Sequence, residues 1–139
     1  MVINVFTDGG ARGNPGISGY GLVILDNKKT IYQQAKYIGI KTNNEAEYIA
    51  LIAAITWLID HQLELNPDTI NFHLDSQLIV RQIQRLYKVK APNLKPLYQT
   101  AVKLLDQLKA KYTFKDVRRE FNSIADMLAN QAMDQKNET

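Results

Sequence analysis

Four acidic residues, widely separated along the chain, lie in short segments that suggest why an acid stands in each. They are Asp8, Glu47, Asp75 and Asp126. Asp8 and Asp75 each follow an apolar run that is typical of a strand. Acids at the carboxyl ends of strands and at adjoining helix starts can meet at one point in an α/β sheet. Carboxylate oxygens gathered there would form a site for a divalent metal, most naturally Mg²⁺, which points to phosphodiester chemistry.

Each acid also has a simple structural explanation. Asp8 could be a turn residue before Gly9, and Asp75 could be the N-cap of a helix. Glu47 and Asp126 could be surface acids favoured by the positive end of a helix. These alternatives stay open for each acid taken alone.

The composition predicts one folded domain over residues 1–139. The chain is 45% hydrophobic and has no cysteine, which excludes a disulfide or a thiolate metal site and agrees with a cytoplasmic location. No apolar stretch approaches the roughly 20 residues that cross a membrane, so we expect no membrane association. The N-terminal residues lack the basic flank and long apolar region of a signal peptide, and we expect them to form the first strand.

The net charge of +3 hides an asymmetry along the chain. Residues 81–119 contain 11 lysines and arginines but only two acids, whereas the rest of the chain is acidic overall. A basic segment beside an acidic site suits a polyanionic substrate such as a nucleic acid. The same lysines could be solvated residues on the outer faces of helices, and charge alone does not separate the two explanations.

The hydrophobic pattern predicts an α/β fold with a five-stranded mixed sheet and helices on both faces. Three closely spaced strands, at 2–7, 19–25 and 30–38, favour an antiparallel start, with parallel additions later. A long helix should begin after Thr42, with Glu45 completing a capping box, and fade near Gln62. The later elements are strand 69–74, helix 76–84, helix 97–109, strand 112–118 and helix 123–134. We expect the polar residues 135–139 to be frayed.

With the elements placed, four motifs together resemble ribonuclease HI, the type 1 ribonuclease H of the RNase H-like superfamily. They are Thr7-Asp8-Gly9-Gly10 with Gly13-Asn14-Pro15-Gly16, then Thr42-Asn43-Asn44-Glu45-Ala46-Glu47, then Asp75-Ser76-Gln77, then Asn122-Ser123-Ile124-Ala125-Asp126-Met127-Leu128-Ala129. Each string is weak alone, but all four in this order cover almost the whole chain. The resemblance implies an RNase H-like fold and endonucleolytic cleavage of the RNA strand of an RNA/DNA hybrid, leaving 5′-phosphate and 3′-hydroxyl ends.

The resemblance also implies roles for single residues. Two Mg²⁺ ions, with Mn²⁺ as an alternative, would be held by the catalytic acids Asp8, Glu47, Asp75 and Asp126. Asp8 would bridge the ions, and Asp126 would help to hold the ion that activates water. Glu47 and Asp75 would hold the ion near the leaving oxygen.

Neutral and basic residues around the acids are candidates for substrate binding. The candidates are Gly9, Gly10, Asn14, Thr42, Asn43, Asn44, Gln77, Arg118 and Arg119. Asn14, Asn44 and Gln77 resemble the family's minor-groove contacts, and Thr42 and Asn43 resemble its phosphate-holding residues. Asn and Thr are also common in turns and caps, and the glycines could serve a tight turn only.

The chain departs from many bacterial members in two places. The histidine of the loop before the last acid is missing, since the only histidines are His61 and His73. Arg118 or Arg119 could supply positive charge there, or form only a surface pair, but arginine cannot act as a general base. The basic helix that grips the hybrid is reduced to a short stretch over residues 85–95, so we expect weaker and more salt-sensitive binding.

The expected partner is an RNA/DNA hybrid, and we expect a monomer without an obligate protein partner. Two alternatives stay open. One is a superfamily nuclease that acts on another nucleic acid, which the match at Asn14, Asn44 and Gln77 disfavours. The other is a non-catalytic nucleic-acid-binding module of the same fold, which has no need of four converging acids.

Overall fold

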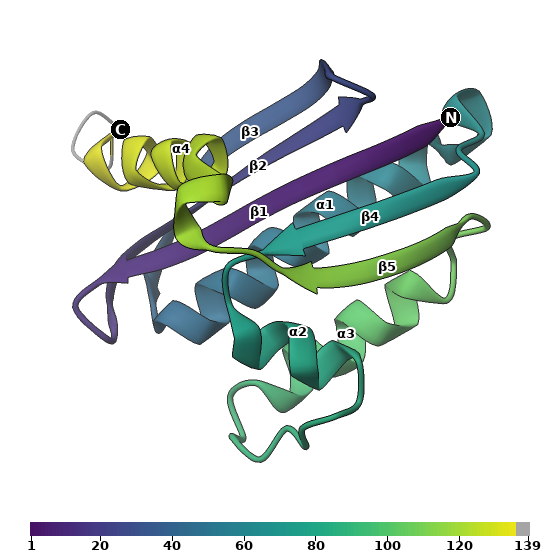
Figure 1. Cartoon of the computed structure of the whole chain (residues 1–139). Helices are drawn as coiled ribbons and strands as arrows, with labels where there is room; N and C mark the ends of the chain where they lie inside the picture. The colour runs from purple at the N-terminus through teal and green to yellow at the C-terminus, as the bar shows by residue number, and fades with distance from the viewer. Residues whose placement is uncertain (136–139) are drawn as a thin grey trace.

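The computed structural model describes residues 1–135, and in them five strands form one sheet with four α-helices around it (Figure 1). The strands are β1 (Val2–Arg12), β2 (Gly16–Asp26), β3 (Lys29–Lys41), β4 (Thr69–Leu74) and β5 (Lys111–Asp116). The helices are α1 (Asn43–Leu65), α2 (Gln77–Ile83), α3 (Lys95–Leu105) and α4 (Ser123–Asp134), with a 3₁₀ turn η1 (Arg119–Asn122) before α4. The tail that was expected to fray lies, from residue 136 onward, outside the described residues.

The sheet has the order β3-β2-β1-β4-β5. The first three strands are antiparallel neighbours, β4 runs parallel to β1, and β5 runs parallel to β4. The predicted mixed sheet, antiparallel first and parallel later, is therefore confirmed. β1 lies at the centre, so it has the antiparallel hairpin on one side and the parallel strands on the other.

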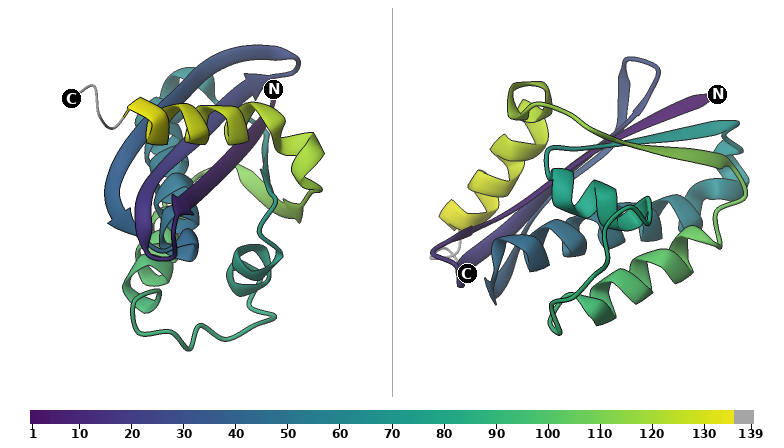
Figure 2. Two further views of the ribbon diagram at one scale, coloured as in Figure 1. Left: turned by 90° about the vertical axis from the view of Figure 1, so that its left-hand side faces the viewer. Right: turned by 60° about the horizontal axis from the view of Figure 1, so that its bottom comes forward.

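The helices cover both faces of the sheet, as predicted. α1 packs on β1 and β2 with α3 beside it, whereas α4 lies across β2 and β3 on the opposite face (Figures 1 and 2). The core lies mainly between α1 and the sheet, where Tyr48, Leu51 and Ile55 of the helix and Phe72 of β4 are fully buried. This packing holds α1 and β1 rigidly against each other.

The expectation that no apolar stretch approaches the length of a membrane span is wrong for α1. Within the described residues, α1 with its 23 residues is long and apolar enough to cross a membrane by length and composition. The sequence hides this because acids and polar residues are spread along the segment. The apolar face of α1 packs on the sheet, where Leu51, Ile55 and Leu58 belong to the core.

The helix starts follow the predicted local signals. Thr42 Oγ1 accepts from the Glu45 backbone N–H at 3.1 Å, and Glu45 Oε1 accepts from the Thr42 N–H at 2.9 Å, which confirms the capping box. α1 ends three residues beyond the expected Gln62, because Asn66 adopts the left-handed conformation and closes the last turn. Ser76 caps α2, so the alternative that Asp75 is its N-cap is wrong.

The largest error of the sequence prediction concerns the first strand. The glycine-rich turn expected directly after Asp8 is absent, and β1 continues to Arg12, paired with β2 from Ile3↔Asp26 to Arg12↔Ile17. The chain turns only at residues 13–15, where Gly13 has a φ of +97°. Pairing with β2 outweighs the weak strand propensity of Gly9 and Gly10. Asp8 therefore lies in the middle of a strand and not at its end.

Two later elements are shorter than predicted. α3 begins two residues before the expected Leu97, with Pro96 in its first turn, and ends at Leu105. β5 ends at Asp116, where its register with β4 also ends. The next residues lead through η1 into α4, which spans the predicted residues.

Candidate active site

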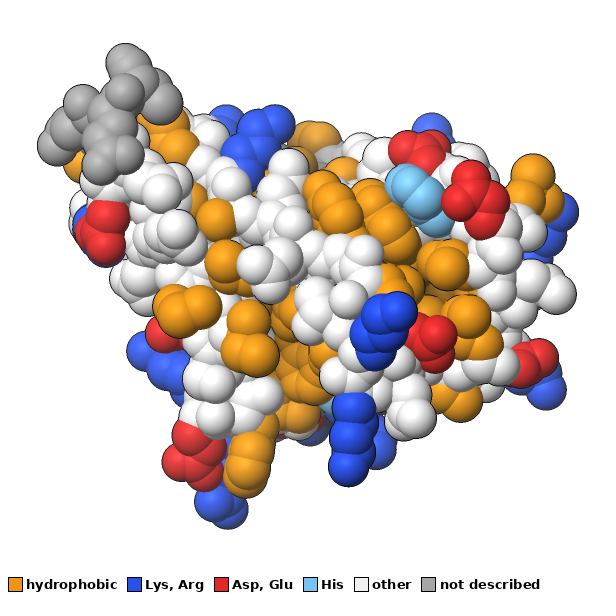
Figure 3. Space-filling view, turned by 90° about the horizontal axis from the view of Figure 1, so that it is seen from above, with side chains coloured by type: hydrophobic (Ala, Val, Ile, Leu, Met, Phe, Trp, Pro, Cys, Tyr) orange, Lys and Arg blue, Asp and Glu red, His pale blue; other side chains and the backbone are white. Residues whose placement is uncertain are grey.

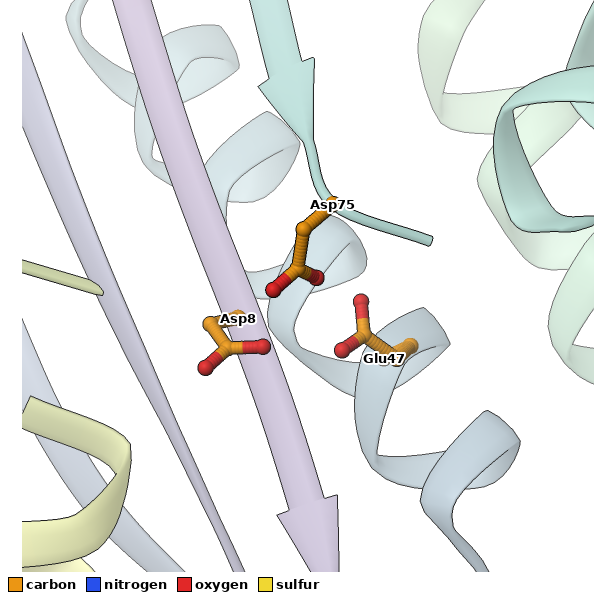
Figure 4. Close-up of side chains that lie close together, drawn as sticks. All are labelled: Asp8, Glu47 and Asp75. Atoms are coloured by element: carbon orange, nitrogen blue, oxygen red, sulfur yellow. The ribbon is translucent and has the colours of Figure 1, made fainter. Parts of the chain in front are cut away.

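Three of the four predicted acids meet at one point (Figure 4). One carboxylate oxygen from each of Asp8, Glu47 and Asp75 lies within 4.8 Å of the other two. Figure 4 shows the three side chains pointing toward one another from β1, from α1 and from the segment just after β4. Residues separated by up to 67 positions thus form a single acidic cluster.

Each acid is positioned by the element that carries it. Asp8 lies in the centre of the sheet, one residue beyond the last β1–β4 pair, Thr7↔Leu74. β4 ends at Leu74, and the chain bends at Asp75 before α2 begins. Asp75 therefore lies beside β1 just beyond the end of β4, where its side chain can turn toward Asp8.

Glu47 reaches the cluster because α1 lies almost in contact with the β1 backbone. A Cβ atom added at Gly9 would lie 2.3 Å from the Ala46 carbonyl carbon and oxygen and 2.5 Å from the Glu47 nitrogen. The Gly9 N–H donates to Glu47 Oε1 at 3.1 Å. Gly9 thus serves close packing and orients the carboxylate, and the alternative that it serves only a tight turn is wrong.

The cluster is buried, and burial controls its protonation. Asp8 and Glu47 are 4% and 6% exposed. Burial, reinforced by the nearby Asp75 and Asp126, raises the pKa of Asp8 to about 7. Burial and the Asp8 carboxylate raise the pKa of Glu47 well above its usual range. Without a cation, the cluster therefore resists full ionisation.

Among the described contacts, Asp75 is the only acid of the cluster that has a basic side chain close by. That positive charge reduces the repulsion between the carboxylates. Arg119 Nε lies 3.6 Å from Asp75 Oδ2. Burial still raises the pKa of Asp75, and the Arg119 guanidinium opposes that rise. The arginine side chain is 80% exposed, so its contribution is screened by solvent.

Asp126 lies at the edge of the cluster. It is in the first turn of α4, half-buried, and lines the same pocket as the other three acids. It is close enough to Asp8 to raise the pKa of that carboxyl, but it is not one of the three within 4.8 Å. The structure therefore brings Asp126 to the site from the opposite face of the sheet, as the outermost of the four acids.

The donor set fits a hard divalent cation. Glu47 Oε2 and Asp75 Oδ2 are buried without a hydrogen-bond partner among the described residues. Unpartnered buried acceptors are costly, and two of them in a cluster of carboxylates would be satisfied by a cation. Oxygen-only ligands of this kind suit Mg²⁺ or Mn²⁺.

The acids open into a pocket of about 640 Å³. Among the predicted substrate residues, those that line it are Gly9, Gly10, Asn43, Asn44, Arg118 and Arg119. Gln77 is exposed at the start of α2 and does not line this pocket, and neither do Asn14 and Thr42. The pocket is therefore bordered by α1 on one side and by the segment before η1 on the other.

Several predicted substrate residues have structural hydrogen bonds. Asn14 Oδ1 accepts from the Asn43 N–H at 3.0 Å, and Asn43 Oδ1 accepts from the Ala11 N–H at 2.8 Å. These bonds join the β1–β2 turn to the start of α1. The side-chain oxygens of both asparagines are thus engaged within the protein. Thr42 is engaged in the capping box.

Arg12 and Asn130 line the pocket and were not predicted from the sequence. Arg12, at the end of β1, forms an ion pair with Asp134 at 2.6 Å and donates to the Asn130 carbonyl at 3.3 Å. Asn130 follows Asp126 by one helical turn, and that spacing could have placed it on the same face of α4. Arg12 gave no sequence signal, because its position depends on β1 continuing past the glycines.

Neither histidine reaches the acids. His73 stacks on Phe6 and its Nε2 lies 2.9 Å from Asn4 Oδ1. His61 stacks on Trp57, which in turn stacks on Tyr32. The expectation that no histidine stands in for the loop histidine of many bacterial members is confirmed for the described residues.

Comparison with known proteins shows which proteins this chain is similar to. A family model described as reverse transcriptase-like matches residues 6–132. A bifunctional protein of Mycobacterium tuberculosis (strain ATCC 25618 / H37Rv) is 39% identical over 136 residues, which are 96% of this chain and 36% of that protein. Ribonuclease HI of Halobacterium salinarum is 35% identical over 133 residues, covering 95% of this chain and 64% of that protein. The chain thus spans about a third of the first relative and less than two thirds of the second.

The solved structures agree with the sequence relatives. LC11-RNase H1, solved in complex with an RNA/DNA hybrid, is 42% identical and superposes with a TM-score of 0.90. The similarity covers 96% of this chain and 97% of that chain. The fold is therefore shared over nearly the whole chain.

Proposed function

The chain belongs to the ribonuclease H family, and from this premise we propose that it is an endonuclease that hydrolyses the RNA strand of RNA/DNA hybrids. The observation that carries the proposal is the group of three buried carboxylates within 4.8 Å of one another. Such a group is costly to keep in a metal-free protein and useful in phosphodiester hydrolysis. The structure of LC11-RNase H1 in complex with an RNA/DNA hybrid supports the choice of substrate.

The cation is proposed to be Mg²⁺, with Mn²⁺ as an alternative. Asp8, Glu47, Asp75 and Asp126 would hold two such ions. When bound, ions of this kind supply an activated water and stabilise charge on the phosphate and the leaving oxygen. Asp8 lies near all three other acids, so its carboxylate would contribute to holding the ions.

The chain itself contributes a rigid and largely dry frame. The Gly9 N–H donates to one oxygen of Glu47, and Arg119, which lines the pocket, forms an ion pair with Asp75 at 3.6 Å. Because the β1 backbone at Gly9 packs closely on α1, we expect the distance between Asp8 and Glu47 to change little when substrate binds. Holding reacting groups in place in this way lowers the entropic part of the barrier.

The basic residues suggest how the hybrid extends away from the acids. Arg85, Lys88 and Lys95 line a second hollow of about 590 Å³, together with Tyr87 and Tyr98. By contrast, the face in Figure 3 carries a strip of hydrophobic side chains with separate lysines and arginines, and not a continuous positive surface. We propose that the hybrid runs from the acidic pocket toward this second hollow, which replaces the basic helix of larger members.

The decisive experiment is cleavage of an end-labelled RNA/DNA hybrid in Mg²⁺ and in Mn²⁺, beside single-stranded RNA, duplex RNA and duplex DNA. The wild type should cut the hybrid, and Asp8→Asn should bind it without cutting. Asp26→Asn, at the far end of β2, is the matched control and should cut normally. Hybrid binding without cleavage by the wild type would favour the non-catalytic module. Cutting of another duplex would favour a different nuclease of the superfamily.

We further propose that residues 1–139 act as a single monomeric domain in the cytoplasm. The absence of cysteine agrees with a reducing compartment. Sedimentation equilibrium with and without hybrid tests the monomer, and localisation of a tagged protein tests the compartment. A dimer that persists at low concentration would overturn the first statement.

A further inference from the structure

Asn122 is a buried polar residue that does not belong to the acidic cluster. Its side chain is 1% exposed and lies at the junction between η1 and α4. Asparagine at a helix N-cap ordinarily accepts a backbone N–H of the first turn. Here it occupies the N-cap position of α4 and makes no such bond.

The Asn122 side chain reaches across to β1 instead. Its Nδ2 donates to the Thr7 carbonyl oxygen at 2.8 Å, joining residues 115 positions apart. Thr7 directly precedes Asp8 and is the last residue of β1 that pairs with β4. The amide therefore meets β1 at the point where β4 leaves it.

This bond is kept at a cost to the fold. Asn122 Oδ1 and the Thr7 hydroxyl oxygen are both buried without a hydrogen-bond partner among the described residues. A residue selected only for stability would cap α4 or would be apolar at this place. The conflict between local rule and observed contact is the kind that marks a functional position.

We propose that Asn122 is a positioning residue that holds Asp126 at the correct place relative to Asp8, an inference that rests on the proposed function. Thr7 and Asp8 are neighbours in β1, and Asp126 lies one turn after Asn122. The hydrogen bond therefore joins the two segments that contain these acids, one residue before Asp8 and four residues before Asp126. Partners of this kind, which orient metal-binding groups without touching the metal, are commonly worth about 10–100-fold in metal affinity or activity.

Packing of α4 on the sheet provides part of this connection. α4 lies on β2 through Gly21, where an added Cβ would be 2.2 Å from the Ala125 carbonyl oxygen and 2.6 Å from Leu128 Cβ. That contact lies in the first turn of α4 and sets the distance between α4 and β2. Asn122 adds a hydrogen bond from the N-cap of α4 to the β1 backbone itself, next to Asp8. Loss of the amide should therefore leave α4 packed on the sheet, while the segment that carries Asp126 loses its hydrogen bond to β1.

The test compares Asn122→Ala with Asn122→Gln, which keeps an amide N–H. Asn71→Ala is the control, because it removes the 2.7 Å hydrogen bond from Thr113 between β4 and β5, away from the acids. Circular dichroism first defines a temperature at which every variant is folded. Hybrid cleavage is then measured as kcat and KM, and Mg²⁺ binding is measured by calorimetry without nucleic acid.

In Asn122→Ala, we expect kcat to fall and the Mg²⁺ dissociation constant to rise, each by about 10–100-fold, with KM unchanged. Asn122→Gln should recover part of both, and Asn71→Ala should change neither. A lower unfolding temperature with unchanged kcat and Mg²⁺ affinity would overturn the proposal. If Asn122→Ala does not fold, Asn122→Gln is compared with Asn122→Leu, an apolar variant of similar size. A higher kcat and tighter Mg²⁺ binding in Asn122→Gln than in Asn122→Leu would support the bond, and equal losses in the two variants would refute it.

The Mg²⁺ arm separates this inference from the proposed function. A wild-type chain that binds Mg²⁺ but does not cut the hybrid would contradict the nuclease proposal. The effect of Asn122→Ala on Mg²⁺ affinity would still support or refute the positioning role.

Discussion

The two neighbouring glycines of β1 should respond in opposite ways to the same added methyl group. At Gly9 a Cβ would lie 2.3 Å from the Ala46 carbonyl group, whereas at Gly10 the nearest atom would be Met133 Cε at an ordinary 3.5 Å. Real Cβ contacts begin near 3.0 Å, so β1 and α1 would have to separate by 3.0 − 2.3, or about 0.7 Å, to admit Gly9→Ala. No such movement is needed for Gly10→Ala.

The energetic consequence follows from that separation. Overpacking of this kind costs about 1–3 kcal/mol. Weakening the bond from the Gly9 N–H to the buried Glu47 carboxylate costs about 1–3 kcal/mol more. We therefore expect Gly9→Ala to lower the free energy of unfolding by about 2–6 kcal/mol. Gly10→Ala should raise it by about 0.4–1 kcal/mol, because alanine has fewer unfolded conformations to lose.

Equilibrium unfolding in urea, followed by circular dichroism in EDTA, measures both variants without any contribution from metal or substrate. The wild type is the reference, and the slope with urea must stay constant for the comparison to hold. A Gly9→Ala midpoint equal to that of the wild type would refute the close approach of β1 to α1. A loss in Gly10→Ala as large as in Gly9→Ala would show that backbone freedom, and not space, makes glycine necessary.

Three further predictions concern charge and capping. Between about pH 4 and 7 the metal-free protein should lose stability as the pH rises, because burial raises the pKa of Asp8 from 3.8 to about 7 and the folded state holds a proton that the unfolded state has released. Thermal unfolding in EDTA should show a larger loss across this range for the wild type than for Asp8→Asn, and equal losses would contradict the assignment. Thr42→Ala should cost about 1 kcal/mol in urea unfolding without nucleic acid, because it removes the cap of α1; an unchanged midpoint would mean that the cap contributes nothing. Lys88→Ala and Lys95→Ala should each reduce the slope of log affinity for the hybrid against log salt by about 1, and an unchanged slope would exclude the second hollow from the contact.

Local sequence signals predicted most elements well. Thr42 and Glu45 form the expected capping box, and β4 and α4 have the expected bounds. These features depend on neighbours within a few residues, so their physical causes are visible in the sequence. The errors lie where distant segments compete with local preference. β1 runs through two glycines because β2 pairs with it, and that pairing depends on Tyr20 and Gly19, which lie eleven and nine positions further along the chain.

The sequence by itself determined the residue types at the site, because each of the four motifs contains an acid whose carboxylate can bind a metal ion. It also determined the order of the elements, because hydrophobic period and caps are local properties. Only the tertiary structure decided that Asp8 lies mid-strand and that Gly9 makes room for α1. It also decided that Asn122 reaches Thr7, while Gln77 stays outside the acidic pocket. Distances across the sheet are set by which backbones meet and how closely they pack, and no short stretch of sequence records that contact.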